Sequence, residues 1–132
     1  MGLIWNNCTL NLKSNLFGKL ADQEFTVELE KLEMIKQHIT TNFYNYPPND
    51  MMIQRLEQAL DNQQKISGAD ASFYFHELKE AELMRQGLSY NEAHQQALKD
   101  YDVSPFSVYH PDVIRAYPDE FNKNWERAWG IT

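Results

Sequence analysis

The sequence predicts an all-α fold, a single compact domain of five to six helices with an irregular N-terminal segment. Apolar residues recur at the three-to-four spacing of a helix in several stretches, and glycines and prolines separate those stretches. The chain has 132 residues, 42% of them hydrophobic, which is enough for one moderate core. We find no repeat or second domain, and therefore assign residues 1–132 to one domain, with 1–20 irregular and 21–132 as its helical core.

Two amphipathic patterns occupy the first half of the chain. Residues 21–40 are expected to form a helix, which ends before the stiff Pro47-Pro48 turn. Its inward face is predicted to consist of Phe25, Leu29, Leu32, Ile35 and Ile39. Asn49 is a good cap for a second helix at about 50–64.

A third and a fourth helix follow in the centre of the chain. The third is expected at about 71–86, and Gly87 is the kind of residue that ends a helix in a left-handed conformation. Ser89 and Glu92 make a capping box for the fourth helix, at about 90–101. The short connection between these two helices favours antiparallel packing.

The C-terminal third contains shorter elements. Residues 103–111 hold too many prolines for a central strand and are expected to form a loop. A short helical turn is predicted at 112–116. Pro118 is expected to open a last helix that Gly130 closes, with Phe121, Trp125 and Trp129 facing inward.

Charge and composition restrict the function. The formal net charge is −7 and no basic stripe is present, which argues against tight, charge-driven binding to nucleic acid. A nuclease is still possible, because acidic residues can be metal ligands. The single cysteine, Cys8, cannot form an internal disulfide or a thiolate metal cage. No apolar run approaches the ~20 residues of a membrane span, and the opening five residues do not resemble a signal peptide.

Four titratable residues interrupt apolar helix faces. His76, Glu77 and Glu80 fall inside the apolar stripe of the third helix, and His94 projects into the middle of the apolar face of the fourth. A carboxylate buried without a partner costs several kcal/mol. These residues must therefore pair, bind a ligand or face a cleft.

Three interpretations fit this group, two catalytic and one structural. His76 and Glu80 are one helical turn apart, and with His94 they would give a divalent ion, zinc or another, three ligands and leave a position for water. The pattern departs from the zinc-peptidase motif His-Glu-x-x-His, because Glu80 stands where the second His would be. A metal-free site would use one His as general base, with Glu77 or Glu80 orienting it or acting as acid, which suits RNA cleavage. Alternatively, the residues form ion pairs and a hydrogen-bonded core histidine.

The other two histidines lie outside the third and fourth helices. His110 lies in a loop before Pro111 and is a second-rank catalytic candidate. His38 lies near the end of a predicted helix, where His is favoured by the helix dipole, and is expected to be structural.

Several segments together resemble a known class of protein. Over about residues 66–131, the chain resembles the C-terminal segment of bacterial polymorphic toxins. Such segments are the variable tips of RHS-repeat, filamentous-haemagglutinin and contact-dependent-inhibition proteins. The segments that carry the resemblance are 74–84, Gly87, Ala93-His94, 103–107, Tyr109-His110-Pro111 and 125–130. The resemblance implies a secreted antibacterial effector that acts in the target-cell cytoplasm and is neutralised by a cognate immunity protein.

From these observations we predict a monomeric toxin domain that acts as a hydrolase. A nuclease is favoured over a peptidase, because such toxin tips commonly cleave nucleic acid. The predicted catalytic residues are His76, Glu77, Glu80, His94 and His110, and the predicted metal ligands are His76, Glu80 and His94. The alternatives are a metal-dependent peptidase-like toxin and a non-enzymatic acidic module, such as an immunity-type protein that covers a basic toxin.

Overall fold

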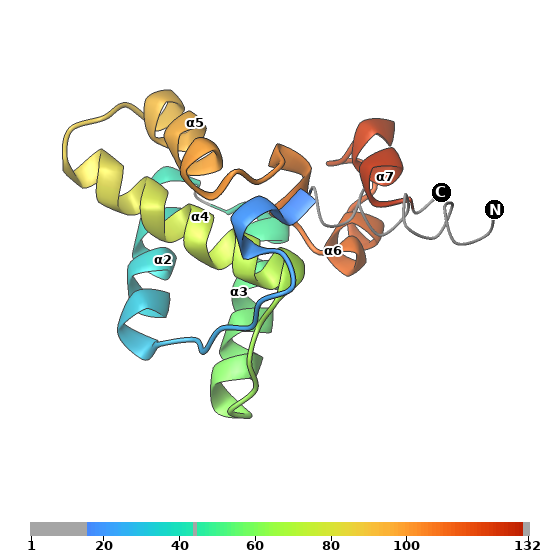
Figure 1. Cartoon of the computed structure of the whole chain (residues 1–132), viewed down its shortest axis with the longest axis horizontal. Helices are drawn as coiled ribbons and strands as arrows, with labels where there is room; N and C mark the ends of the chain where they lie inside the picture. Colours follow the sequence, from blue (N-terminus) through green and yellow to red (C-terminus); the bar gives the residue numbers. More distant parts are fainter. Residues whose placement is uncertain (1–15, 44, 131–132) are drawn as a thin grey trace.

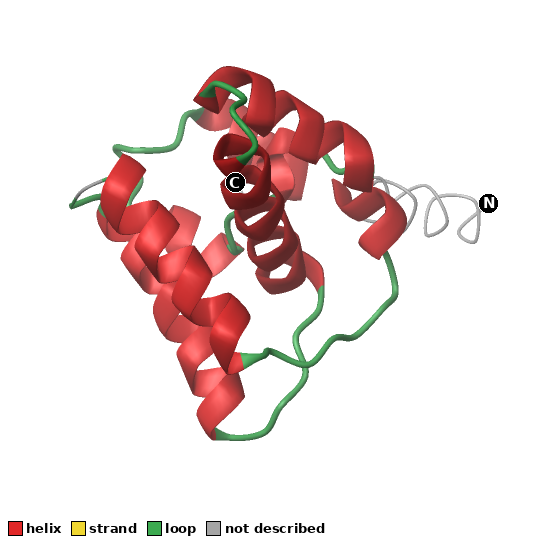
Figure 2. Ribbon diagram, turned by 90° about the vertical axis from the view of Figure 1, so that its left-hand side faces the viewer, coloured by secondary structure: helices red, strands yellow, loops and turns green. Residues whose placement is uncertain are grey.

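The computed structural model describes residues 16–43 and 45–130, and this part of the chain is an all-α domain, as predicted. Cys8 and the opening residues lie outside the described residues. The helices are α2 (Leu29–Asn42), α3 (Pro47–Asp61), α4 (Gly68–Arg85), α5 (Tyr90–Tyr101), α6 (Pro111–Ala116) and α7 (Lys123–Trp129), with 3-10 turns η1 (Gly18–Leu20) and η2 (Pro105–Ser107). Helices joined by loops account for the described fold (Figure 2), and no helix within it is long and apolar enough to cross a membrane.

Helix α4 is the centre of the domain. It packs against α2 and α3 on one side and α5 on the other, while α6 and α7 lie together at one end (Figure 1). Its side chains Phe73 and Tyr74 are almost completely buried. Helix α4 carries apolar residues on several sides because other elements cover it on several sides.

Polar contacts hold the N-terminal half of α4 against its neighbours. Arg55 of α3 makes a bidentate pair with Asp70, with N···O distances of 2.8 and 3.0 Å. The Tyr74 hydroxyl accepts a hydrogen bond from the backbone of Glu28, just before α2. Because these contacts hold α4 against both α2 and α3, the polar residues on its next two turns have a fixed position.

The predicted start of the first helix is wrong. Helix α2 starts at Leu29 and not at residue 21, because the backbone of Phe25 pairs with that of Ile66 through two hydrogen bonds of 2.9 and 2.8 Å. That pairing requires an extended chain, and the Phe25 ring packs edge-on against Phe75 of α4. A contact over 41 positions therefore overrides the helical pattern of residues 21–28.

Other boundaries moved by smaller amounts. Helix α3 begins at Pro47, since proline at a first helical position loses no hydrogen bond, and Asn49 lies buried inside the helix instead of capping it. The last helix begins at Lys123, capped by Asn122, and Pro118 lies in the preceding turn. The bounds of α5 and its capping box agree with the prediction.

Candidate functional site

The titratable residues singled out in the sequence meet between α4, α5 and α2. His76, Glu77 and Glu80 are each 6% exposed or less, and His94 is half-buried at the edge of the group. The chain turns back after Gly87, which has φ +107°, and the capping box then starts α5 so that His94 faces α4. His94 therefore meets Glu80, a contact that depends on how the two helices cross.

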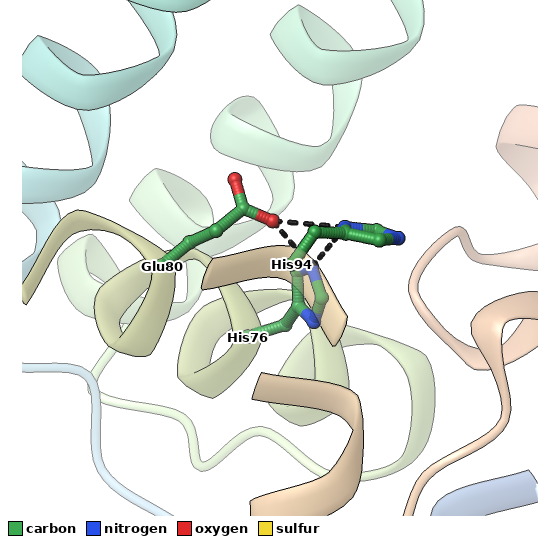
Figure 3. A group of neighbouring side chains, drawn as sticks. All are labelled: His76, Glu80 and His94. Carbon is green, nitrogen blue, oxygen red and sulfur yellow. Dashed lines mark hydrogen bonds and ion pairs between the residues drawn. The ribbon is translucent and has the colours of Figure 1, made fainter. Parts of the chain in front are cut away.

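Three atoms that could be metal ligands, one from each of His76, Glu80 and His94, form a small triangle (Figure 3). The Oε2 atom of Glu80 lies 2.7 Å from His76 Nε2 and 3.0 Å from His94 Nδ1. The two ring nitrogens are themselves 3.0 Å apart. A proton on each nitrogen would aim two N–H groups at one oxygen, whereas a cation would use the lone pairs of all three atoms.

The separations suit a divalent ion. Ligand atoms about 2.1 Å from an ion and at tetrahedral or octahedral angles to one another are about 3.0–3.4 Å apart. The observed edges are at or slightly below the lower end of that range. The buried group His76, Glu80 and His94 could therefore hold a metal ion, with two imidazoles and one carboxylate as ligands.

His38 is a member of the site that the sequence analysis missed. Its Nε2 atom lies 3.0 Å from the other oxygen of Glu80, Oε1, and 3.4 Å from Glu77 Oε2. Asn42, one turn later on α2, places its amide nitrogen 3.2 Å from His38 Nδ1 and donates to the His38 carbonyl. The available signal was the position of His38 between Ile35 and Ile39 on the buried face of the helix, the same anomaly that identified His94.

The cluster shifts the pKa values of its members in opposite directions. Burial opposes the charged forms of both His38 and Glu80, but their mutual contacts outweigh it. The two carboxylates raise the pKa of His38 to about 9, and the three imidazoles hold the pKa of Glu80 well below its usual range. The hydrogen bond with Glu80 also raises the pKa of His94.

Glu77 behaves differently from Glu80. Burial raises its pKa, and contact with His38 offsets only part of that effect. Its Oε2 atom is within ion-pair distance of His38 but has no hydrogen bond to the described residues, and His76 Nδ1 lacks a partner there as well. Buried polar atoms without a hydrogen bond are rare in folded proteins, and these two atoms are therefore candidates for contact with a ligand.

A pocket of about 530 Å³ opens beside the cluster. Its polar end is formed by His76, Glu77 and His94. The walls consist of aromatic and aliphatic side chains together with two asparagines, namely Phe43, Tyr46, Tyr90, Val108, Tyr109, Trp125, Pro105, Asn45 and Asn49. No lysine or arginine of the described residues lines it, so a ligand would be held by ring contacts and by the His/Glu end.

His110 is placed apart from these residues. It caps α6 by accepting a hydrogen bond from the Asp112 backbone, and its ring lies 3.7 Å from the Asp112 carboxylate. It does not line the pocket, and burial lowers its pKa. The structure thus brings together four of the five predicted catalytic residues, with His110 in a helix-capping position.

The chain was compared with protein-family models, with curated proteins and with solved structures, and no match was found in any of the three comparisons. The proposed function therefore rests on the geometry of the site and on the resemblance stated above.

Proposed function

We propose that this chain is a metal-dependent hydrolase that cleaves nucleic acid, with His76, Glu80 and His94 as the ligands of a divalent ion. The observation that carries the proposal is the triangle of donor atoms, 2.7–3.0 Å apart, at the polar end of an aromatic pocket. Three protein ligands leave a coordination position for water, as in catalytic zinc sites.

An ion held by His76, Glu80 and His94 would supply the nucleophile for phosphodiester hydrolysis, because a divalent ion lowers the pKa of a bound water molecule towards neutrality. In that reaction the bond between phosphorus and the leaving ester oxygen would break, and that oxygen would take up a proton from solvent. The chain would contribute the ligand set and the pocket-lining carboxylate of Glu77, one oxygen of which has no hydrogen bond to the described residues.

The pocket walls favour substrates with unpaired bases. Bases stack on aromatic side chains with about 1–3 kcal/mol each, whatever their sequence. Tyr46, Tyr90, Tyr109 and Trp125 line the same pocket as His76 and His94 and would offer such surfaces. Because the chain is acidic overall and the pocket has no cationic side chain among its described lining, stacking and the metal–phosphate contact would provide most of the affinity.

The toxin resemblance gives this activity its proposed setting. Residues 66–131, which carry the resemblance, include His76, Glu77, Glu80 and His94. We therefore propose an antibacterial effector domain that acts inside the target cell and is inhibited by an immunity protein. A peptidase-like toxin would use the same ligands, and its substrate would differ.

An acidic binding module is the second candidate, and the net charge of −7 favours it. A surface that covers a basic partner needs exposed acids. The two carboxylates of the cluster are buried, and three histidines surround them. This arrangement favours an enzyme over an acidic binding module.

The test uses purified, untagged protein and fluorogenic single-stranded DNA and RNA. After removal of metal by a chelator, we expect Zn²⁺, Mn²⁺ or Mg²⁺ to restore cleavage to the wild type and to His110→Asn, a control that keeps a capping side chain on α6. Glu80→Gln should be inactive with all three metals. RNA cleavage that persists in chelator and spares DNA would instead identify a metal-free histidine mechanism, and peptide cleavage alone would identify the peptidase.

Expression in a bacterium without an immunity protein separates the two candidate functions. A toxin should arrest growth, and His76→Ala should relieve that arrest. Harmless expression of the folded wild type would favour the binding module.

A further inference from the structure

Glu80 uses its two oxygens for two different sets of residues. Oε2 contacts His76 and His94, whereas Oε1 lies 3.0 Å from His38 Nε2. Glu77 Oε2 completes the second set at 3.4 Å from the same nitrogen of His38. A carboxylate with this division of contacts is suited to bridge two cations.

We infer that the cluster is a two-metal centre, in which Glu80 bridges one ion held by His76 and His94 and a second ion held by His38 and Glu77. This inference rests on the proposed metal-dependent function and adds a second ion to it. The second set comes from α2 and α4, and its three ligand atoms lie within 4.8 Å of one another.

The second set has an independent feature that points to a ligand. Glu77 is 6% exposed, and its Oε2 atom, the one closest to His38, has no hydrogen bond to the described residues. An ion next to His38 Nε2 would give Glu77 Oε2 the contact that it lacks among the described residues. The 3.0 and 3.4 Å separations also match the spacing of about 3.0–3.4 Å between ligands of one ion.

The second set also has access from outside. His38 borders a smaller pocket of about 300 Å³, shared with Asn42, Ala81 and Arg85, while Glu77 borders the aromatic pocket. An ion held by His38 and Glu77 would therefore contact one lining residue of each pocket. In many nucleases and phosphatases, two metal ions about 3.5–4 Å apart stabilise both the attacking and the leaving oxygen of a phosphodiester.

The decisive measurement is metal stoichiometry. Untagged apoprotein is dialysed against Mn²⁺ or Zn²⁺, and bound metal is measured by mass spectrometry alongside protein concentration. We expect two equivalents in the wild type and in His110→Asn. We expect one in His38→Ala and one in Glu77→Gln, which keeps the side-chain volume, and substantial loss of both ions in Glu80→Gln.

Electron paramagnetic resonance of the Mn²⁺ protein gives a second readout. Two bridged ions should give an exchange-coupled spectrum, which His38→Ala and Glu77→Gln convert to the six-line spectrum of an isolated ion. Circular dichroism checks that each variant is folded, and Glu77→Gln serves if His38→Ala is not.

The outcomes distinguish the inference from the function on which it rests. One uncoupled equivalent in the wild type, lost in His76→Ala and kept in Glu77→Gln, would overturn the two-metal centre and leave the single-metal hydrolase standing. Two equivalents that persist in both Glu77→Gln and a folded His38→Ala would also overturn it. No bound metal at all would overturn both.

Discussion

At the scale of single residues, Glu80 controls the site. It is 1% exposed, and its two oxygens contact three imidazoles, from α2, α4 and α5. Burying one carboxylate costs several kcal/mol unless charged or hydrogen-bonded partners compensate. Each histidine is therefore held by the same carboxylate that it stabilises, and removing the charge should affect all three.

We predict that Glu80→Gln loses bound metal and remains folded. The amide keeps the volume of the side chain, but it lacks the negative charge and can accept on only one atom. The free energy of unfolding should fall by at least about 1.5–3 kcal/mol, the value of one hydrogen bond to a charged group, because Glu80 contacts three imidazoles. Urea unfolding in chelator measures the stability change, and a variant with wild-type metal content would contradict the role of Glu80.

We also predict how the stability of the metal-free protein depends on pH. The pKa of His38 is raised from 6.5 to about 9, so its contribution is complete below about pH 6.5 and disappears as the pH rises through 9. The raised pKa of Glu77, whose charged form is disfavoured in the folded state, acts in the same direction, and so does the pKa of His94, which the hydrogen bond with Glu80 raises. Glu80, with a lowered pKa, contributes above pH 4.5 and loses that contribution in acid.

The free energy of unfolding in chelator should therefore fall between pH 6.5 and 9, by an amount on the order of 2–3 kcal/mol. Urea titrations at pH 6, 7.5 and 9 check this. His38→Gln, which cannot be protonated, should flatten most of the change, and an equally steep decline in that variant would assign it to other groups.

At the scale of elements, the start of α5 positions His94. Ser89 accepts a hydrogen bond from the Glu92 backbone, and the Glu92 side chain accepts one from the Ser89 backbone. This capping box is local, which is why the bounds of α5 could be read from the sequence. The start of α2, by contrast, could not be read from the sequence. It depends on the pairing of Phe25 with Ile66, which are 41 positions apart, and no local sequence pattern indicates such a pairing.

We predict that Ser89→Ala destabilises the domain by about 1 kcal/mol, the usual value for removing an N-cap side chain. Ser67→Ala is a matched control, because Ser67 occupies the N-cap of α4 without a side-chain capping bond and is exposed. Its effect should be within about 0.5 kcal/mol of zero. Urea unfolding of both variants measures the difference, and equal losses would contradict the capping argument.

At the scale of the whole molecule, an acidic protein carries an aromatic pocket. The net charge is −7, and the walls of the pocket are largely ring surfaces. Such a protein cannot rely on counterion release to hold a nucleic acid. Its preference should be for strands whose bases are free to stack.

We predict that binding of single-stranded oligonucleotide to the chelated protein depends weakly on salt. The affinity should change less than about tenfold between 50 and 200 mM salt, against about 10³–10⁵ for a protein with 6–10 phosphate contacts. Fluorescence anisotropy measures it, and Trp125→Ala should weaken binding about 5–150-fold by removing one stacking surface. A steep salt dependence would show that cationic side chains outside the pocket hold the strand.

The sequence by itself determined the helical class, the bounds of α5, and the fact that His76, Glu80 and His94 needed partners. Those features follow from local hydrogen bonds and from the helical repeat, which every short segment carries with it. The tertiary structure alone decided that His38 reaches Glu80 across 42 positions, that Phe25 is extended, and that His110 caps α6 away from the site. These features depend on how segments that are distant in the sequence pack against one another. The buried carboxylate of Glu80, for example, is stabilised by the side chains that this packing brings within about 3 Å of it.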